Sequence, residues 1–146
     1  ASALHTRLTM STLFVYGSLK EGFPNFHVNQ GRRLAGTYRT AERHELWLCN
    51  GQLPCLLPAQ GTGHHVVGQL FEVSGDDLAA MDRLERVDEP GGYRRIEIGV
   101  MAQHDPDRGL IQAFVYVQDP ALLAQPGEHV GPIAEYTHEH AQRLRW

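Results

Sequence analysis

Apolar and polar residues along the chain follow patterns that predict mostly short strands. The apolar segment Thr12 to Tyr16 ends at Gly17, which is typical of a buried first strand. Two short β-prone pieces lie between Tyr38 and Cys49, and Asn50-Gly51 then gives a strong hairpin signal. Further strands are predicted over Leu53 to Leu57, His65 to Val73, Tyr93 to Met101 and Ile111 to Val117. The prolines in and after the first of these predict an edge or irregular strand.

Two helices are expected among these strands. Ser74 is a suitable N-cap, and the two aspartates that follow suit the positive end of a helix dipole. One helix should therefore run from about Gly75 to about Arg86, where a Pro-Gly-Gly stretch follows. A second helix is predicted from about Pro132 to about Leu144, with the proline at an early helical position. Many short strands with one or two helices predict an α+β domain, in which the strands can form a small, partly closed barrel.

The length and composition of the chain predict one domain with one hydrophobic core. The chain has 146 residues, of which 42% are hydrophobic and 21% are charged. Ala1 to Thr9 lack the apolar segment of a signal peptide, and Met10 precedes the first apolar run. We therefore expect residues 1–9 to be a leader or an expression scar and residues 10–146 to form a single domain.

Charge and cysteine content narrow the class of protein. The net charge is -4, whereas nucleic-acid binders usually carry a basic excess. No apolar run approaches the roughly 18 residues of a membrane span. The two cysteines, Cys49 and Cys55, are too few for a disulfide scaffold or a zinc site. We expect reduced thiols in a cytoplasmic protein with no nucleic-acid or membrane partner, whose oligomeric state the sequence does not indicate.

Glu85 is the first candidate for chemistry. On the predicted helix it lies two turns after Leu78, and therefore on or beside the apolar face. Burial of a carboxylate raises its pKa, and the C-terminal end of a helix disfavours negative charge, so this position points to a proton carrier. The alternative is that the helix frays there and Glu85 pairs with Arg94, Arg95 or solvent.

The segment Tyr16-Gly17-Ser18-Leu19 is the second candidate. A glycine after a buried strand allows a ligand to approach the backbone closely, and successive N–H groups can form a concave anion site. The phosphate-loop and dinucleotide glycine patterns are absent, which favours a carboxylate or carbonyl oxygen as the ligand. The alternative is a strand that simply ends in a turn.

The nine histidines do not form a recognisable metal motif. His64 and His65 are adjacent and would face opposite sides of a strand, and His138 and His140 are two residues apart, so they would not meet on a helix. We expect no metal, although a site assembled from distant residues remains an alternative.

Several short motifs follow one another in a specific order and spacing. They are LFVYGSLK at 13–20, LPCLLP at 53–58, VGQLFEV at 67–73, MDRLE at 81–85, YRR at 93–95 and FVYV at 114–117. Together they resemble the γ-glutamylcyclotransferase-like family, and most closely its γ-glutamylamine cyclotransferase and avirulence-induced-gene-like branch. The resemblance covers about residues 13–117, and the segment beyond carries no family signal that we use.

The resemblance implies a fold and a set of site residues. The fold would be α+β, a small mixed β-barrel with flanking helices. Glu85 would be the general acid/base, because it occupies the position of the family's catalytic glutamate. Tyr16, Gly17, Ser18 and Leu19 would cradle the γ-glutamyl group through backbone amides. Tyr93 and Tyr116 would line or brace the pocket.

The implied activity is cyclisation of a γ-glutamyl amine or amide to 5-oxoproline and a free amine, which requires no cofactor. A non-catalytic module that binds a small molecule in the same pocket is the alternative. Glutathione is the less favoured substrate, because glutathione-specific relatives open with a different glycine-rich pattern. Asp88 and Glu89 follow the implied acid/base, and they either disfavour acidic leaving groups or are merely solvated.

Overall fold

The structure, a computed structural model, describes residues 10–142 of the chain. Its strands are β1 (Met10–Val15), β2 (Arg32–Arg33), β3 (Tyr38–Thr40), β4 (His44–Cys49), β5 (Leu53–Gln60), β6 (Val67–Ser74), β7 (Arg94–Ala102), β8 (Ile111–Val117) and β9 (Val130–Ile133). Its α-helices are α2 (Gly75–Leu84) and α3 (His138–Gln142), and its 3-10 helices are η1 (Phe26–Val28), η2 (Pro106–Arg108) and η3 (Pro120–Ala124). The residues expected to form a leader, 1–9, lie outside the described part.

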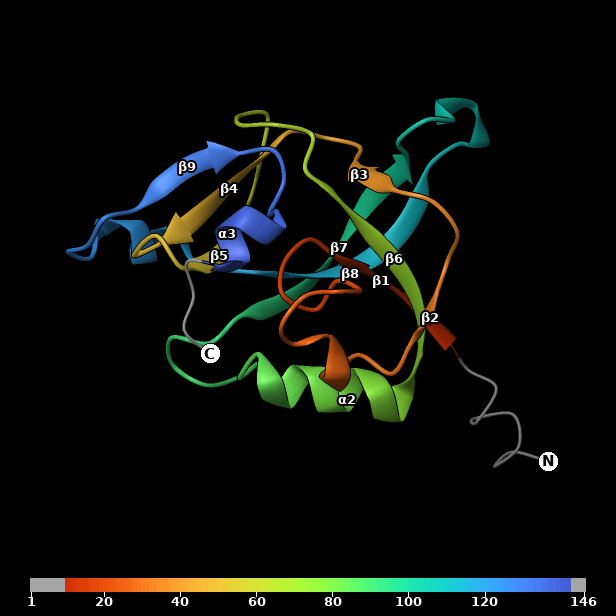
Figure 1. Ribbon diagram of the computed structural model, residues 1–146, viewed down its shortest axis with the longest axis horizontal. Coiled ribbons are helices and arrows are strands. Elements are labelled where there is room, and N and C mark those ends of the chain that lie inside the picture. Colours follow the sequence, from red (N-terminus) through yellow and green to blue (C-terminus); the bar gives the residue numbers. More distant parts are fainter. Residues whose placement is uncertain (1–9, 143–146) are drawn as a thin grey trace.

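Most strands pair into a sheet that closes on itself. Its order is β1-β8-β7-β3-β6-β2, and a further pairing joins β1 to β6, so that five of the strands form a ring. The pairing of β1 with β8 is parallel, and the other pairings around the ring are antiparallel. The sheet is therefore mixed, and the predicted α+β fold is confirmed (Figure 1).

A second sheet, of order β5-β4-β9, lies beside the ring (Figure 1). The hairpin between β4 and β5 turns at Asn50 and Gly51, which have φ values of 57° and 69° and so form the predicted tight turn. The returning arm is an edge strand, as its prolines predict. The main chain of Gln118, just after β8, donates to the carbonyl of Leu56 at 2.8 Å and joins the two sheets.

The second half of β1, Leu13 to Val15, is buried on both faces, which explains its run of three apolar residues. Phe14 belongs to the core cluster inside the ring. Leu13 and Val15 belong to a second cluster, which includes Leu78 and Met81 of α2. Because successive side chains of a strand point to opposite faces, β1 separates the core inside the ring from the core between the ring and α2.

Helix α2 begins as predicted and ends one residue before Glu85, which is its C-cap. The side chain of Ser74 accepts a hydrogen bond from the Asp77 amide at 3.1 Å, as expected of an N-cap. The helix predicted from Pro132 to Leu144 is wrong over its first half, because Pro132 lies in strand β9, and its predicted end at Leu144 lies outside the described residues. Since β9 pairs with β4, this segment is extended, and α3 begins only at His138.

Candidate functional site

The loop after β1 contains a short run of backbone amides that have no hydrogen-bond acceptor among the described residues. The carbonyl of Gly17 accepts from the Lys20 amide at 3.1 Å, and that of Ser18 accepts from the Asn25 amide at 2.9 Å. The carbonyl of Leu19 accepts from the side chain of Asn29 at 3.1 Å. By contrast, the amides of residues 17–19 donate to no described residue. Fixed carbonyls and unpaired N–H groups are the arrangement that an anionic oxygen requires.

Gly17 is required at this point for steric reasons. A Cβ atom on this residue would lie 2.9 Å from Cγ of Pro54, which belongs to a rigid ring in the adjoining strand β5. The close approach of the two segments therefore depends on the absence of a side chain. It also brings the start of β5 to the rim of the site.

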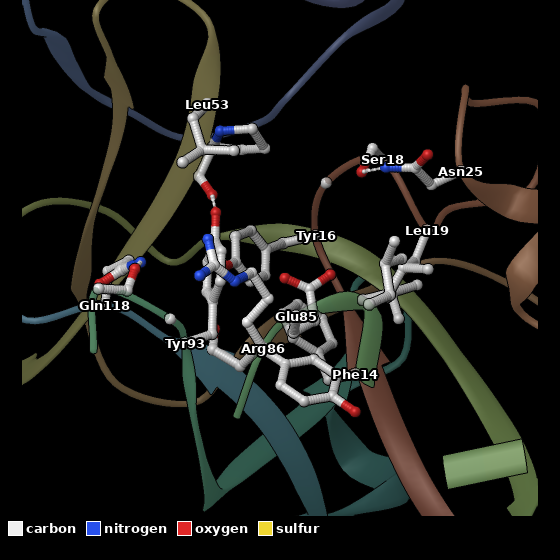
Figure 2. A pocket seen from close by; sticks show the side chains of 17 residues that line it. Phe14, Tyr16, Ser18, Leu19, Asn25, Leu53, Glu85, Arg86, Tyr93 and Gln118 are labelled. Carbon is white, nitrogen blue, oxygen red and sulfur yellow. Dashed lines mark hydrogen bonds between the residues drawn. The ribbon is translucent and has the colours of Figure 1, made fainter. Parts of the chain in front are cut away.

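Glu85 lies opposite this loop at the end of α2. Figure 2 shows its carboxylate directed into the space between Tyr16 and Leu19. The side chain is half-buried, and burial raises its pKa from 4.5 to about 7. The alternative of a pairing with Arg95 does not occur, because that guanidinium binds Asp82 at 2.6 Å. No described cation forms an ion pair with Glu85.

Three tyrosines frame the space around this carboxylate. The hydroxyl of Tyr16 donates to the carbonyl of Tyr116 at 2.8 Å, and that of Tyr93 donates to the carbonyl of Pro54 at 2.7 Å. The Tyr116 hydroxyl donates to Asp82 at 2.7 Å. Burial raises the pKa of each of the three, so all are neutral near pH 7. With their protons committed to fixed acceptors, they brace the site and leave Glu85 as its titratable acid.

These groups enclose a cavity of about 280 Å³. It lies between the end of β1, the start of β5, the end of α2 and the segment before β7 (Figure 2). Its lining residues are Phe14, Val15, Tyr16, Gly17, Ser18, Leu19, Asn25, Leu53, Pro54, Leu84, Glu85, Arg86, Gly91, Gly92, Tyr93, Tyr116 and Gln118. This volume suits a small molecule such as one amino-acid unit with a short substituent.

Every candidate site residue from the sequence lines this one cavity, although β1, α2, β7 and β8 are far apart along the chain. Sequence reasoning missed Arg86 and Gln118. Gln118 follows β8 directly and donates from its side-chain amide to the carbonyl of Gly91 at 3.1 Å. Arg86 follows Glu85, and its adjacency to that candidate was the available signal. Asp88 and Glu89 are exposed and are not among the lining residues, which agrees with their being solvated.

Within the part of the chain that the structure describes, no three His, Cys, Asp or Glu side chains gather as a potential metal site. Among residues 10–142, no helix has the length and apolar character that crossing a bilayer requires.

Comparison with known proteins gives consistent matches. A family model described as gamma-glutamyl cyclotransferase, AIG2-like matches residues 13–138, which extends beyond the motifs found in the sequence. A Bos taurus protein named gamma-glutamylaminecyclotransferase is 34% identical over 143 residues, covering 94% of this chain and 82% of its own length. A relative from Arabidopsis thaliana is 34% identical over 103 residues, so the match spans 66% of this chain and only 54% of that relative.

A solved structure of an AIG2-like protein has a similar fold. The crystal structure of an AIG2-like protein from Mus musculus superimposes with a TM-score of 0.71 and 32% sequence identity. The match covers 94% of this chain and 95% of the mouse chain. The overall fold is therefore shared over nearly the whole length of both proteins.

Proposed function

The chain belongs to the gamma-glutamyl cyclotransferase, AIG2-like family, and on that premise we propose that it cyclises a γ-glutamyl amine or amide, with Glu85 as general acid/base. The products are 5-oxoproline and the free amine. The observation that supports this proposal most strongly is a half-buried carboxylate with a pKa of about 7 that faces a run of unpaired backbone amides across a small cavity.

The reaction is an intramolecular aminolysis. The α-amino nitrogen of the substrate attacks its own γ-carbonyl carbon, a C–N bond forms to close a five-membered ring, and the C–N bond to the leaving amine breaks. The α-ammonium nitrogen loses one proton to solvent before the attack and a second one as it becomes the lactam N–H. This second proton is taken up at the site, and one proton is delivered to the departing amine. Glu85 performs both transfers in turn, and its pKa near 7 suits both, because its protonated and ionised forms are each well populated near neutral pH.

The cavity supplies geometry for this step. A γ-glutamyl chain is flexible, and holding its two ends in contact removes much of the entropic barrier to ring closure. The free amides of Gly17, Ser18 and Leu19 bind a substrate oxygen, either of the α-carboxylate or of the γ-carbonyl as it becomes negatively charged. Tyr16, with Tyr93 and Tyr116, keeps the walls rigid through the hydroxyl bonds described above.

The relatives' names and the size of the cavity both support this substrate class. Relatives from Bos taurus and Mus musculus are named gamma-glutamylaminecyclotransferases, at 34% and 36% identity. For this chain a γ-glutamyl group attached to a small amine is consistent with a cavity of about 280 Å³.

The test is a panel of γ-glutamyl amines and γ-glutamyl dipeptides, incubated with the protein and assayed for 5-oxoproline by mass spectrometry. We expect product from at least one compound and its loss in Glu85→Gln. If ligands raise the melting temperature while the whole panel yields no product, the protein is a binding module and the proposed reaction is wrong.

A further inference from the structure

Arg86 occupies a backbone position where glycine is the usual residue. Helix α2 ends in a Schellman motif. The Val87 amide donates to the carbonyl of Asp82 at 3.0 Å, and the Arg86 amide donates to the carbonyl of Arg83 at 3.2 Å. The residue after the C-cap in this motif is left-handed, and Arg86 has a φ of 57°. In this conformation a residue with a side chain has a higher backbone energy than glycine. The presence of arginine here therefore calls for an explanation other than the end of the helix.

The side chain of Arg86 lines the cavity beside Glu85, and these two are the charged groups among its lining residues. Figure 2 shows Arg86 on the opposite side of Glu85 from Ser18 and Leu19. Its single ion pair among the described residues is a loose one with Glu89, at 3.5 Å, and both side chains are more than half exposed. The guanidinium is therefore available to a ligand, because an exposed pair of this kind is weak.

We propose that Arg86 selects the leaving group, and that the preferred substrates carry a carboxylate next to the scissile amide, as in a γ-glutamyl-α-amino acid. This inference rests on the proposed function. It assigns to Arg86 a role in specificity, separate from the proton transfers of Glu85.

Ring closure separates the leaving amine of the substrate from its α-carboxylate. During ring closure the reacting nitrogen and the γ-carbonyl carbon are adjacent, so the α-carboxylate and the leaving amine diverge to two sides of the bond that forms. With Glu85 at that bond, one side faces the amides of 17–19 and the other faces Arg86. A guanidinium binds a carboxylate with two parallel hydrogen bonds, which a neutral substituent cannot offer.

The experiment compares two substrates that differ in one group. γ-Glutamylalanine carries the carboxylate, and γ-glutamylalaninamide replaces it with a neutral amide. We expect the wild-type protein to favour the first by at least about tenfold in kcat/KM, and Arg86→Gln and Arg86→Gly to reduce this ratio to nearly one. Arg83→Gln, in the last turn of the same helix and outside the cavity, is the matched control and should keep the wild-type ratio.

The melting temperature separates specificity from a structural role. Arg86→Gly should melt at or above the wild-type temperature, because glycine suits the left-handed backbone. A lower melting temperature with an unchanged substrate ratio would mean that Arg86 serves only the helix end, where a cation is favourable. An equal loss on both substrates would place Arg86 at the glutamyl α-carboxylate instead, and either result overturns the inference.

The outcomes also distinguish this inference from the proposed function. If the wild-type protein releases no 5-oxoproline from either compound or from the wider panel, the proposed function fails and the inference with it. If it turns over both compounds with a ratio near one, the function stands and the assignment of Arg86 is wrong.

Discussion

Replacing Glu85 with glutamine should stabilise the protein, and the gain should depend on pH. The substitution keeps the shape of the side chain and removes its charge. In the folded protein, burial raises the pKa of this carboxyl from 4.5 to about 7, so the folded state binds the proton more tightly than the unfolded state. Ionising Glu85 above pH 7 therefore costs folding free energy that glutamine avoids.

The size of the effect follows from the two pKa values. Their difference of 2.5 corresponds to about 3 kcal/mol at about 1.4 kcal/mol per pH unit. Below pH 4.5 the carboxyl is protonated in both states and the two proteins should be nearly equal in stability. The variant's advantage should grow between pH 4.5 and 7 and level off above it. For a chain of this size about 3 kcal/mol is a shift of about 6 to 12 °C in the melting temperature.

The assay is thermal unfolding of both proteins at intervals from pH 4.5 to 8.5, with the difference between them taken at each pH. Other titrating groups are common to both proteins and cancel in this difference. A difference that does not change with pH, or a variant that is less stable at pH 8, would show that Glu85 is not desolvated. In that case the reasoning from its burial to its role would be wrong.

Two further substitutions test what holds the site together. Gly17→Ala should lower the melting temperature and kcat, because the new Cβ would lie 2.9 Å from Pro54. Overpacking of this kind costs about 1 to 3 kcal/mol. Unchanged kinetics would mean that the loop after β1 is not held tightly against β5. Asp82→Asn should weaken the ion pair with Arg95 and the bond from Tyr116, and cost about 1 to 2 kcal/mol in urea unfolding. Since these contacts hold the end of α2, kcat should fall more than KM rises, and a pure KM effect would contradict this.

Much of the fold was predictable because local sequence and burial agree. The hairpin at Asn50-Gly51 and the cap at Ser74 are set by local backbone chemistry, and both occur as predicted. The predicted strand at Ile111 to Val117 has those bounds in the structure. Its register beside β1, however, depends on packing between distant segments, so the strand pattern predicted a partly closed barrel but not which strands pair to close it.

The region after β8 shows where such reasoning fails. Pro132 is a common residue at helix starts, yet it lies in β9 because that segment pairs with β4. This long-range contact leaves no periodic signal in four residues. In the site, Glu85 was identifiable from its place on an apolar helix face, whereas Arg86 was not. The spacing of residues along the chain does not reveal that Arg86 has a left-handed backbone, or that this residue lines the same cavity as Glu85.

The most direct test of the account is the pH dependence of 5-oxoproline formation by the wild-type protein and by Glu85→Gln. With the γ-glutamyl substrate that is turned over fastest, the account predicts that kcat/KM of the wild type rises with pH through an apparent pKa near 7. The variant should lose about 100-fold or more of this activity, and with it the dependence near pH 7. A variant that forms product at the wild-type rate with the same pH profile would contradict the central claim.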